Sequence, residues 1–182
     1  MSDSNRIRFQ KLSESDLALM HRWLNTDFVN QWYGKKQCSY EEVREKYLPR
    51  INGEAPTSSF LILYNDTPIG YIQTYRLADY PDYSKHLQVD ENAAGVDLFI
   101  GEREYIHRGL GHVILGTFLR EIVFASEEID SCVVGPEPKN TAAIRCYEKT
   151  GFRYLKTVHV PAEPEPEYLM RIDREMLQLD TE

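Results

Sequence analysis

Asp97 is the residue of this sequence that is best placed to handle a proton on a cation. It lies in a stretch where Val96, Leu98 and Ile100 alternate with Asp97 and Phe99, which is the period-two pattern of a β-strand. A carboxylate among apolar side chains needs a partner, because its ionised form is costly to bury. Near an amine it can bind the protonated form and then take its proton, directly or through water. The alternative is a structural acid that pairs with a buried base or a backbone turn.

Tyr147 can act on a leaving group, because a phenol donates a hydrogen bond at neutral pH. It lies four residues after Ala143, so the two side chains share one face of the predicted helix. The alternative is a core tyrosine that packs behind Phe152. Cys146 is its neighbour in the chain, but no histidine is placed in the sequence to pair with that thiol. We therefore expect a buried and inert cysteine.

A glycine-containing turn follows the Asp97 strand, and a helical pattern follows the turn. The turn is Arg108-Gly109-Leu110-Gly111, and apolar residues then recur three and four apart as far as Ile122. A helix start leaves about four backbone N–H groups unpaired and carries about half a positive charge. Glycines let a phosphate approach these groups closely, so the segment predicts a phosphate site. A simple tight turn between strand and helix is the alternative.

A second stretch, Pro138 to Phe152, follows the apolar strand Ser131 to Val134. The two stretches together resemble the GCN5-related N-acetyltransferases (GNAT). In that family an Arg/Gln-x-x-Gly-x-Gly/Ala motif holds the pyrophosphate of acetyl-coenzyme A, and a later helix contacts the coenzyme arm and supplies a tyrosine near the thiol. The resemblance is carried by Gly109, Gly111, Asn140, Ala143, Tyr147, Gly151 and Phe152. Ile106 departs from it, because Arg or Gln is usual there, so backbone contacts would carry more of the binding.

The resemblance implies an acyltransferase that uses acetyl-coenzyme A as cosubstrate and no metal. An amine attacks a thioester only as the free base, whereas alkyl amines are mostly protonated at neutral pH. Asp97 would bind the amine or take its proton, and Tyr147 would be the acid at the thiolate. For Asn140, a role as a helix cap and a role as a coenzyme contact are equally consistent with the sequence. The implied coenzyme contacts are Phe99, Ile100, His107, Arg108, Gly109, Leu110, Gly111, His112, Asn140 and Ala143.

The whole chain is similar to one group of that family, the aminoglycoside 6′-N-acetyltransferases. These enzymes acetylate the 6′-amine of kanamycin- or tobramycin-like antibiotics, and antibiotic resistance is the result. The similarity is carried by Trp23 to Asn25, Gln31 to Gly34, Tyr47 to Pro49, Pro68 to Tyr75, Gly95 to Asp97, Gly109 to Gly111 and Ala143 to Lys149. By alignment, the drug contacts would be Tyr33, Tyr47, Gln73, Asp82 and Asp97.

The alignment also shows departures at the drug site. Tyr33 stands where the relatives carry Trp, and their acid after the Tyr47 helix falls at Ala55, with Glu54 one residue away. Drug preference therefore stays open. Aromatic faces with hydroxyl tips suit sugar rings that bear amines. Tyrosines are frequent in this half of the chain: Tyr33, Tyr47, Tyr71, Tyr75, Tyr80 and Tyr83.

Acidic and basic residues gather in different segments of the chain. The net charge is −8, which disfavours nucleic acid and anionic membranes and suits a polycationic amine, although acidity also serves solubility alone. Five acids lie close together: Asp79, Asp82, Asp90, Glu91 and Asp97. Bases lie at the two coenzyme motifs: Arg103, Arg108, Lys139, Arg145 and Lys149. An anionic coenzyme and a cationic acceptor would favour this division.

The length of 182 residues predicts a single N-acetyltransferase domain over residues 1–182. The cysteines Cys38, Cys132 and Cys146 are odd in number and lack metal-ligand spacing, which indicates a reducing compartment. We find neither an apolar signal core nor a run of membrane-spanning length. We therefore expect a cytoplasmic protein that is a monomer or a weak homodimer.

The apolar patterns predict an α/β fold, and the resemblance implies the GNAT acyltransferase fold, a mixed, mostly antiparallel central sheet with helices on both faces. Capping-box patterns predict helices after Ser13 and Ser39. We expect a long polar loop from Arg76 to Ala94. The expected strands are Arg6 to Leu12, Ser59 to Tyr64, Ile69 to Tyr75, Val96 to Ile100, Ser131 to Val134, Arg153 to Val160 and Glu167 to Ile172.

Two other functions stay open. The same fold can act on a siderophore precursor or on a protein N-terminal amine, and the substrate loop would decide between these acceptors. A non-catalytic protein that binds the coenzyme or sequesters a drug is the third possibility. The presence of both Asp97 and Tyr147 argues against it.

Overall fold

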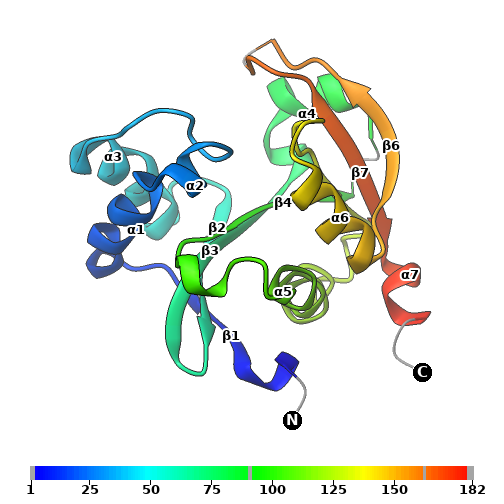
Figure 1. Cartoon of the computed structure of the whole chain (residues 1–182). Coiled ribbons are helices and arrows are strands. Elements are labelled where there is room, and N and C mark those ends of the chain that lie inside the picture. The colour runs from blue at the N-terminus through cyan, green and yellow to red at the C-terminus, as the bar shows by residue number, and fades with distance from the viewer. Residues whose placement is uncertain (1–2, 90–91, 162, 180–182) are drawn as a thin grey trace. The chain divides into compact units, whose positions relative to one another are not determined.

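The computed structural model describes residues 3–89, 92–161 and 163–179 (Figure 1). Two compact units divide the chain: unit 1 is Met1–Thr74 with Asp97–Leu110, and unit 2 is Tyr75–Val96 with Gly111–Glu182. Seven strands form a sheet in the order β1-β2-β3-β4-β5-β7-β6. Strands β4 and β5 pair in parallel, whereas β1–β2, β5–β7 and β6–β7 are antiparallel. The mixed, mostly antiparallel sheet predicted from the sequence is confirmed.

Unit 1 contains the N-terminal strand, the first helices and the hairpin. Its elements are η1 (Asp3–Arg6), β1 (Ile7–Lys11), η2 (Glu14–Asp16), α1 (Leu17–Leu24), α2 (Asp27–Asn30), α3 (Tyr40–Ile51), β2 (Thr57–Tyr64), β3 (Thr67–Arg76) as far as Thr74, the end of β4 (Ala93–Ile100) and η4 (Arg103–Tyr105).

Both predicted capping boxes are present in unit 1. The Glu42 N–H donates to Ser39 Oγ at 3.2 Å, and the Ser39 N–H donates to Glu42 Oε2 at 2.7 Å, where α3 begins. The box at Ser13 instead begins a short 3₁₀ turn, because the Asp16 N–H bonds to the Ser13 carbonyl three residues back. Helix α1 therefore begins only at Leu17.

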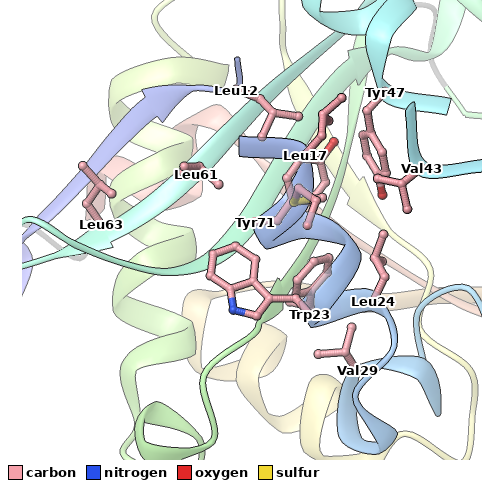
Figure 2. Close-up of a cluster of buried hydrophobic side chains, with 12 residues drawn as sticks. Leu12, Leu17, Trp23, Leu24, Val29, Val43, Tyr47, Leu61, Leu63 and Tyr71 are labelled. Atoms are coloured by element: carbon pink, nitrogen blue, oxygen red, sulfur yellow. The ribbon is translucent and has the colours of Figure 1, made fainter. Parts of the chain in front are cut away.

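The core of unit 1 gathers the apolar faces of α1, α3 and the hairpin (Figure 2). The predicted α1 stripe of Leu17, Met20 and Leu24 is buried, as its helical spacing requires. Trp23 is fully buried and donates its indole N–H to Glu102 Oε1 at 2.9 Å. A β-carbon at Gly101 would lie 2.3 Å from this indole, so only glycine fits there.

Unit 2 contains the remaining helices and the C-terminal strands. Its elements are η3 (Leu77–Asp79), α4 (Pro81–Leu87), most of α5 (Leu110–Phe118), the π-helical turn η5 (Leu119–Val123), β5 (Ser131–Val134), α6 (Thr141–Thr150), β6 (Arg153–Val158), β7 (Glu167–Asp173) and α7 (Arg174–Leu179), together with the start of β4. Strand β6 is the last in the sheet order, and its pairing with β7 shifts register between Tyr154 and Lys156.

The predicted loop from Arg76 to Ala94 was wrong for most of its length. It holds η3 and α4, and β4 begins at Ala93 rather than at Val96. Leu77 and Leu87 are buried and anchor the segment, and Pro81 occupies the first turn of α4, where it costs no hydrogen bond. The segment between these leucines is rich in polar residues, so its sequence did not predict the helix. Asp90 and Glu91, two of the five predicted acids, lie outside the described residues.

Other element ends also differ from prediction, among them the starts of β2 at Thr57 and of β3 at Thr67. The helix after the glycine turn ends at Phe118 and continues as η5, and β6 ends at Val158 rather than at Val160. The expectation of one domain over residues 1–182 stays a prediction. Among the described residues, none of the helices has the length and apolarity that a membrane span requires.

Candidate active site

Asp97 and Gln73 form the centre of the candidate site in unit 1. Asp97 lies on β4, and its Oδ2 accepts a hydrogen bond from Gln73 Nε2 on β3 at 2.7 Å. Asp97 is half-buried, and Gln73 is only 7% exposed. The predicted partner of this acid is thus an amide. A neutral donor stabilises the ionised carboxylate and leaves its charge in place for a cationic acceptor.

A hydrogen-bond network fixes the Gln73 amide. Its Oε1 accepts from the Tyr71 hydroxyl at 2.8 Å and from Arg50 Nη1. The Tyr71 hydroxyl also contacts Arg50 Nη1 at 3.4 Å and Ser59 Oγ at 2.7 Å. Since the Tyr71 proton goes to Gln73, Ser59 is the donor in the last contact. Residues of α3, β2, β3 and β4 thus converge on Asp97.

Tyrosines form an aromatic wall beside this network. The Tyr47 and Tyr71 rings meet edge to face with centroids 5.4 Å apart (Figure 2). Tyr33 packs against Tyr71 at 6.4 Å and against Phe99 at 4.9 Å. Within the described part of the chain, the buried Tyr47 hydroxyl has no hydrogen-bond partner. An unsatisfied buried hydroxyl costs about 1–3 kcal/mol, so this group is suited to bond a molecule bound beside it.

The tyrosines of the wall are neutral donors at physiological pH. Burial raises the pKa of Tyr71 to about 12 and is also the main cause that raises the pKa values of Tyr33 and Tyr47. Two cations lie on these rings: Lys46 Nζ is 5.5 Å from the centroids of Tyr33 and Tyr47, and Arg50 Cζ is 5.1 Å from that of Tyr47. The wall therefore offers both hydroxyl donors and π faces that attract cations.

Four of the five predicted drug contacts belong to this cluster. Tyr33, Tyr47, Gln73 and Asp97 all meet around Tyr71, through the ring contacts and hydrogen bonds already described. Phe99, predicted as a coenzyme contact, is 8% exposed and packs its ring against Trp23, Tyr33 and Tyr71. Its side chain is therefore a core residue, and a coenzyme contact there would fall to its backbone.

Sequence reasoning missed Arg50 and the role of Tyr71. Arg50 follows Tyr47 by three residues on α3, a spacing that places both on one helix face. That spacing was a usable signal. The link from Arg50 to Gln73 spans 23 residues and required the tertiary structure.

Asp82, the fifth predicted drug contact, belongs to unit 2. It lies in the first turn of α4, its side chain is 99% exposed, and its Oδ1 pairs with Lys85 Nζ at 2.9 Å. Its hydrogen bond to Lys85 lowers the pKa of Asp82, so the carboxylate is ionised at neutral pH. A role for Asp82 in binding an amine stays a prediction.

The glycine turn has the backbone geometry of an anion site. His107 and Gly109 have left-handed φ values of 62° and 75°, and Arg108 lies between them. Alternation of left- and right-handed residues turns successive N–H groups toward one side, and α5 begins immediately afterwards at Leu110. His107, Arg108 and Gly109 are exposed. A pyrophosphate contact at this turn stays a prediction, and Ile106 adds no charge to it.

Helix α6 positions Tyr147 in unit 2. Asn140 Oδ1 accepts from the Ala143 N–H at 3.2 Å, which confirms Asn140 as the helix cap. Tyr147 is 9% exposed, and its ring centroid lies 5.9 Å from that of Phe152. Cys146 is partly buried rather than buried as predicted, and this burial raises the pKa of its thiol to about 11, which fits the predicted inertness. A catalytic role for Tyr147 and a coenzyme contact for Asn140 stay predictions.

Comparison with known proteins identifies the family. The acetyltransferase (GNAT) domain family matches residues 13–160, so the chain belongs to this family. The chain is 28% identical over 165 residues to the aminoglycoside N(6′)-acetyltransferase type 1 of Klebsiella pneumoniae. This match covers 90% of this chain and 82% of that protein.

Two solved structures of the aminoglycoside acetyltransferase AAC(6′)-Ib are similar throughout. One is in complex with paromomycin and acetyl-CoA, with a TM-score of 0.88 and 28% identity over 97% of this chain and 98% of that chain. The other is in complex with coenzyme A and kanamycin, with a TM-score of 0.86 and 28% identity over 95% and 98%. The acetyltransferase fold predicted from the two motifs is confirmed.

Proposed function

We propose that this protein transfers the acetyl group of acetyl-coenzyme A to the 6′-amine of an aminoglycoside, by direct attack of the amine on the thioester. The observation that carries the proposal is the Asp97 carboxylate, which Gln73 holds beside a wall of tyrosines. The similarity to aminoglycoside N(6′)-acetyltransferases over 90% of the chain supports the choice of acceptor.

Asp97 would bind the protonated amine and then accept its proton. The Gln73 N–H occupies one carboxylate oxygen and stabilises the ionised form, which is the form that a base requires. Proton removal produces the free amine that can act as nucleophile. Asp97 would hand the proton to solvent after the transfer, because the site is only half-buried.

Tyr33 and Tyr47 would bind the amino-sugar ring. Both are neutral phenols, which can bond to amines and hydroxyls, and the Tyr47 hydroxyl lacks a partner among the described residues. Gln73 would keep its amide on Asp97 during binding. Asp82, exposed on α4, would contribute negative charge to the binding of a polycation.

The coenzyme supplies the acetyl group as a thioester. The backbone from His107 to His112 would hold its pyrophosphate, since the turn carries two left-handed residues and continues into α5. The exposed side chain of Arg108 would add positive charge there. Ile100 and Ala143 would contact the coenzyme arm, and Tyr147 would donate a hydrogen bond to the departing thiolate.

The place of action follows from the thiols. Cys38, Cys132 and Cys146 form no disulfide with one another in the structure, and we infer a reducing compartment such as the cytoplasm. We expect the small-molecule acceptor to be the main partner, with no role for nucleic acid or membrane, because the net charge is −8.

The test is acetylation of kanamycin beside its analogue with a hydroxyl at the 6′ position. Both compounds are polycations of nearly the same shape, and they differ at the 6′ group, where the analogue lacks both the nucleophilic amine and its positive charge. We expect turnover of kanamycin alone, measured as thiol release from acetyl-coenzyme A. Equal turnover of both compounds, or turnover of neither while a hydroxylamine or a peptide amine reacts, would overturn the proposal.

Salt dependence provides a second test of the acceptor class. Exposed charges are screened over about 8 Å at physiological ionic strength, so a polycation held by carboxylates should show a KM that rises with salt. A siderophore precursor that is not a polycation should show little such dependence. An unchanged KM for kanamycin between low and high salt would contradict binding by Asp82 and Asp97 together.

A further inference from the structure

We propose that Arg50 is a positioning residue for Asp97, and that it acts through the side-chain amide of Gln73. The proposal rests on the proposed function in one respect, the role of Asp97 as the group that receives the proton of the amine. Arg50 matches none of the sequence-predicted site residues, yet its Nη1 bonds to the amide that holds Asp97.

The Gln73 amide has two unlike ends, and Arg50 reinforces the orientation in which the N–H end faces Asp97. Arg50 Nη1 donates to Gln73 Oε1, and Gln73 Nε2 donates to Asp97 Oδ2 at 2.7 Å. A guanidinium can donate but never accept. If the amide turned over, its N–H₂ would face the guanidinium and its oxygen would face the carboxylate. Both hydrogen bonds would be lost, so the observed orientation follows from the chemistry of the three groups.

Tyr71 alone cannot impose this orientation. Its hydroxyl donates to Gln73 Oε1 at 2.8 Å, but a hydroxyl can also turn and accept. Ser59, its other partner at 2.7 Å, can likewise donate or accept. Arg50 is the donor in this chain of hydrogen bonds whose role is fixed, as the ionised Asp97 is the fixed acceptor at its other end. Together they give the whole chain its direction, from guanidinium through amide to carboxylate.

Arg50 is also held in place for this task. It is half-buried on α3, and its guanidinium carbon lies 5.1 Å from the centre of the Tyr47 ring. Its Nη1 lies 3.4 Å from the Tyr71 hydroxyl. Gln73 is 7% exposed, so water competes little with the contact between guanidinium and amide. A long side chain that stacks and bonds at once loses little further freedom when the site is used.

The remaining titratable groups of the cluster do not replace Arg50. Burial raises the pKa values of Tyr33, Tyr47 and Tyr71, so these phenols stay neutral across the working pH range. Lys46 is exposed and lies over the rings of Tyr33 and Tyr47. Loss of Arg50 should therefore disfavour the ionised form of Asp97 and raise its pKa.

The first experiment measures Asp97 directly, without any substrate. The carboxyl carbon of Asp97 is titrated by ¹³C NMR in the wild type, R50M, R50K and R44M. Arg44 is the matched control, because it lies on the same helix and pairs with the exposed Glu14 at 3.0 Å. We expect R50M to raise the Asp97 titration midpoint, because the amide that donates to the carboxylate loses the guanidinium that orients it. R50K, which keeps the charge, should raise it less, and R44M should not move it.

The second experiment measures turnover. We expect R50M to lower kcat/KM for kanamycin by about 10- to 100-fold, the range for a hydrogen bond to a charged group, and to shift its acid limb to higher pH. KM for acetyl-coenzyme A should be unchanged. In a Q73M background the R50M substitution should have a much smaller effect, because the amide that links Arg50 to Asp97 is gone.

Each outcome supports or contradicts the proposal. An Asp97 midpoint that is the same in the wild type and in a folded R50M would overturn it, as would tighter kanamycin binding by R50M with an unmoved acid limb. Should R50M fail to show a cooperative thermal transition, R50K carries the comparison with its smaller expected shift. Wild type that does not acetylate kanamycin would refute the proposed function alone, because the NMR titration needs no acceptor.

Discussion

Gly111 and Cys146 are in direct contact between helices α5 and α6. A β-carbon added at Gly111 would lie 2.7 Å from Cys146 Sγ and 4.0 Å from Cys146 Cβ. The first distance is far below van der Waals contact, and the second is an ordinary one. The second glycine of the motif predicted to bind pyrophosphate is therefore favoured by helix packing, whatever it contributes to the coenzyme.

We expect G111A to destabilise the protein through this clash. Overpacking costs about 1–3 kcal/mol, which corresponds to a fall in Tm of several degrees for a chain of this size. C146A removes the sulfur, so the G111A substitution should have little effect in a C146A background. Thermal melts of the wild type, both single variants and the double variant measure the coupling. Additive losses would show that Cys146 is not the group that Gly111 accommodates.

C146A alone should retain turnover. Burial raises the pKa of the Cys146 thiol to about 11, so it is protonated at neutral pH and is a poor nucleophile. Because the pKa of this thiol is higher in the folded protein than in the unfolded chain, its contribution to stability is complete below the ordinary thiol pKa. That contribution is lost as pH rises toward 11. Loss of kcat in folded C146A, or an acetylated Cys146 detected by mass spectrometry during turnover, would indicate a covalent route instead of direct attack.

G109V should weaken coenzyme binding. Gly109 has φ of 75°, which a β-branched residue adopts only with strain of about 1–2 kcal/mol, and its side chain would crowd the proposed phosphate site. We expect KM for acetyl-coenzyme A to rise about tenfold or more. G53V is the control, because Gly53 has φ of 76° and nothing within 4 Å of a β-carbon. Equal coenzyme KM in the two variants would place the pyrophosphate elsewhere.

D97N should remove the base and leave the fold intact. Asparagine keeps an oxygen that can accept from Gln73 Nε2, but it cannot take a proton at neutral pH. We expect kcat/KM for the amine to fall by about two to four orders of magnitude. D66N is the control, since Asp66 lies in an exposed turn and pairs with Arg8. Wild-type rates in D97N across about pH 6 to 9 would make Asp97 a structural residue.

Y147F should lower kcat much more than it raises KM for the amine, because a donor to the leaving thiolate acts in the transition state. Stopped-flow measurement of thiol release gives kcat separately from binding. Y154F is the matched control, since Tyr154 is 52% exposed on β6 and its hydroxyl contacts Thr157 at 3.2 Å. A rise in amine KM with unchanged kcat would assign Tyr147 to substrate binding.

Local patterns predicted the parts of the site that local interactions build. The Ser39 capping box, the Asn140 cap and the strand around Asp97 involve residues close in sequence, and all three are present. The family resemblance then predicted that Tyr33, Tyr47 and Gln73 lie at the same binding site as Asp97. These residues do converge, because their helices and strands share the core of unit 1.

Long-range contacts account for what the sequence did not predict. Helix α4 is held by buried Leu87 and by a hydrogen bond from Tyr83 to Glu167, 84 residues away. No pattern within the segment signals that bond. The chain from Arg50 through Gln73 to Asp97 likewise joins α3, β3 and β4. From sequence alone, a polar residue on a helix face is expected to contact solvent, and only the tertiary structure identifies its partner.

The register shift in β6 has a consequence for how molecules of this protein meet each other. An end strand with an unbroken row of unpaired N–H and C=O groups invites edge-to-edge aggregation. Here the irregularity between Tyr154 and Lys156 interrupts that row at the point where Tyr154 and Leu155 are exposed, and Arg153 and Lys156 place charge on either side. A distorted and charged edge cannot template a second strand along its length. The same bulge that disturbs the pairing with β7 thus disfavours strand addition along β6.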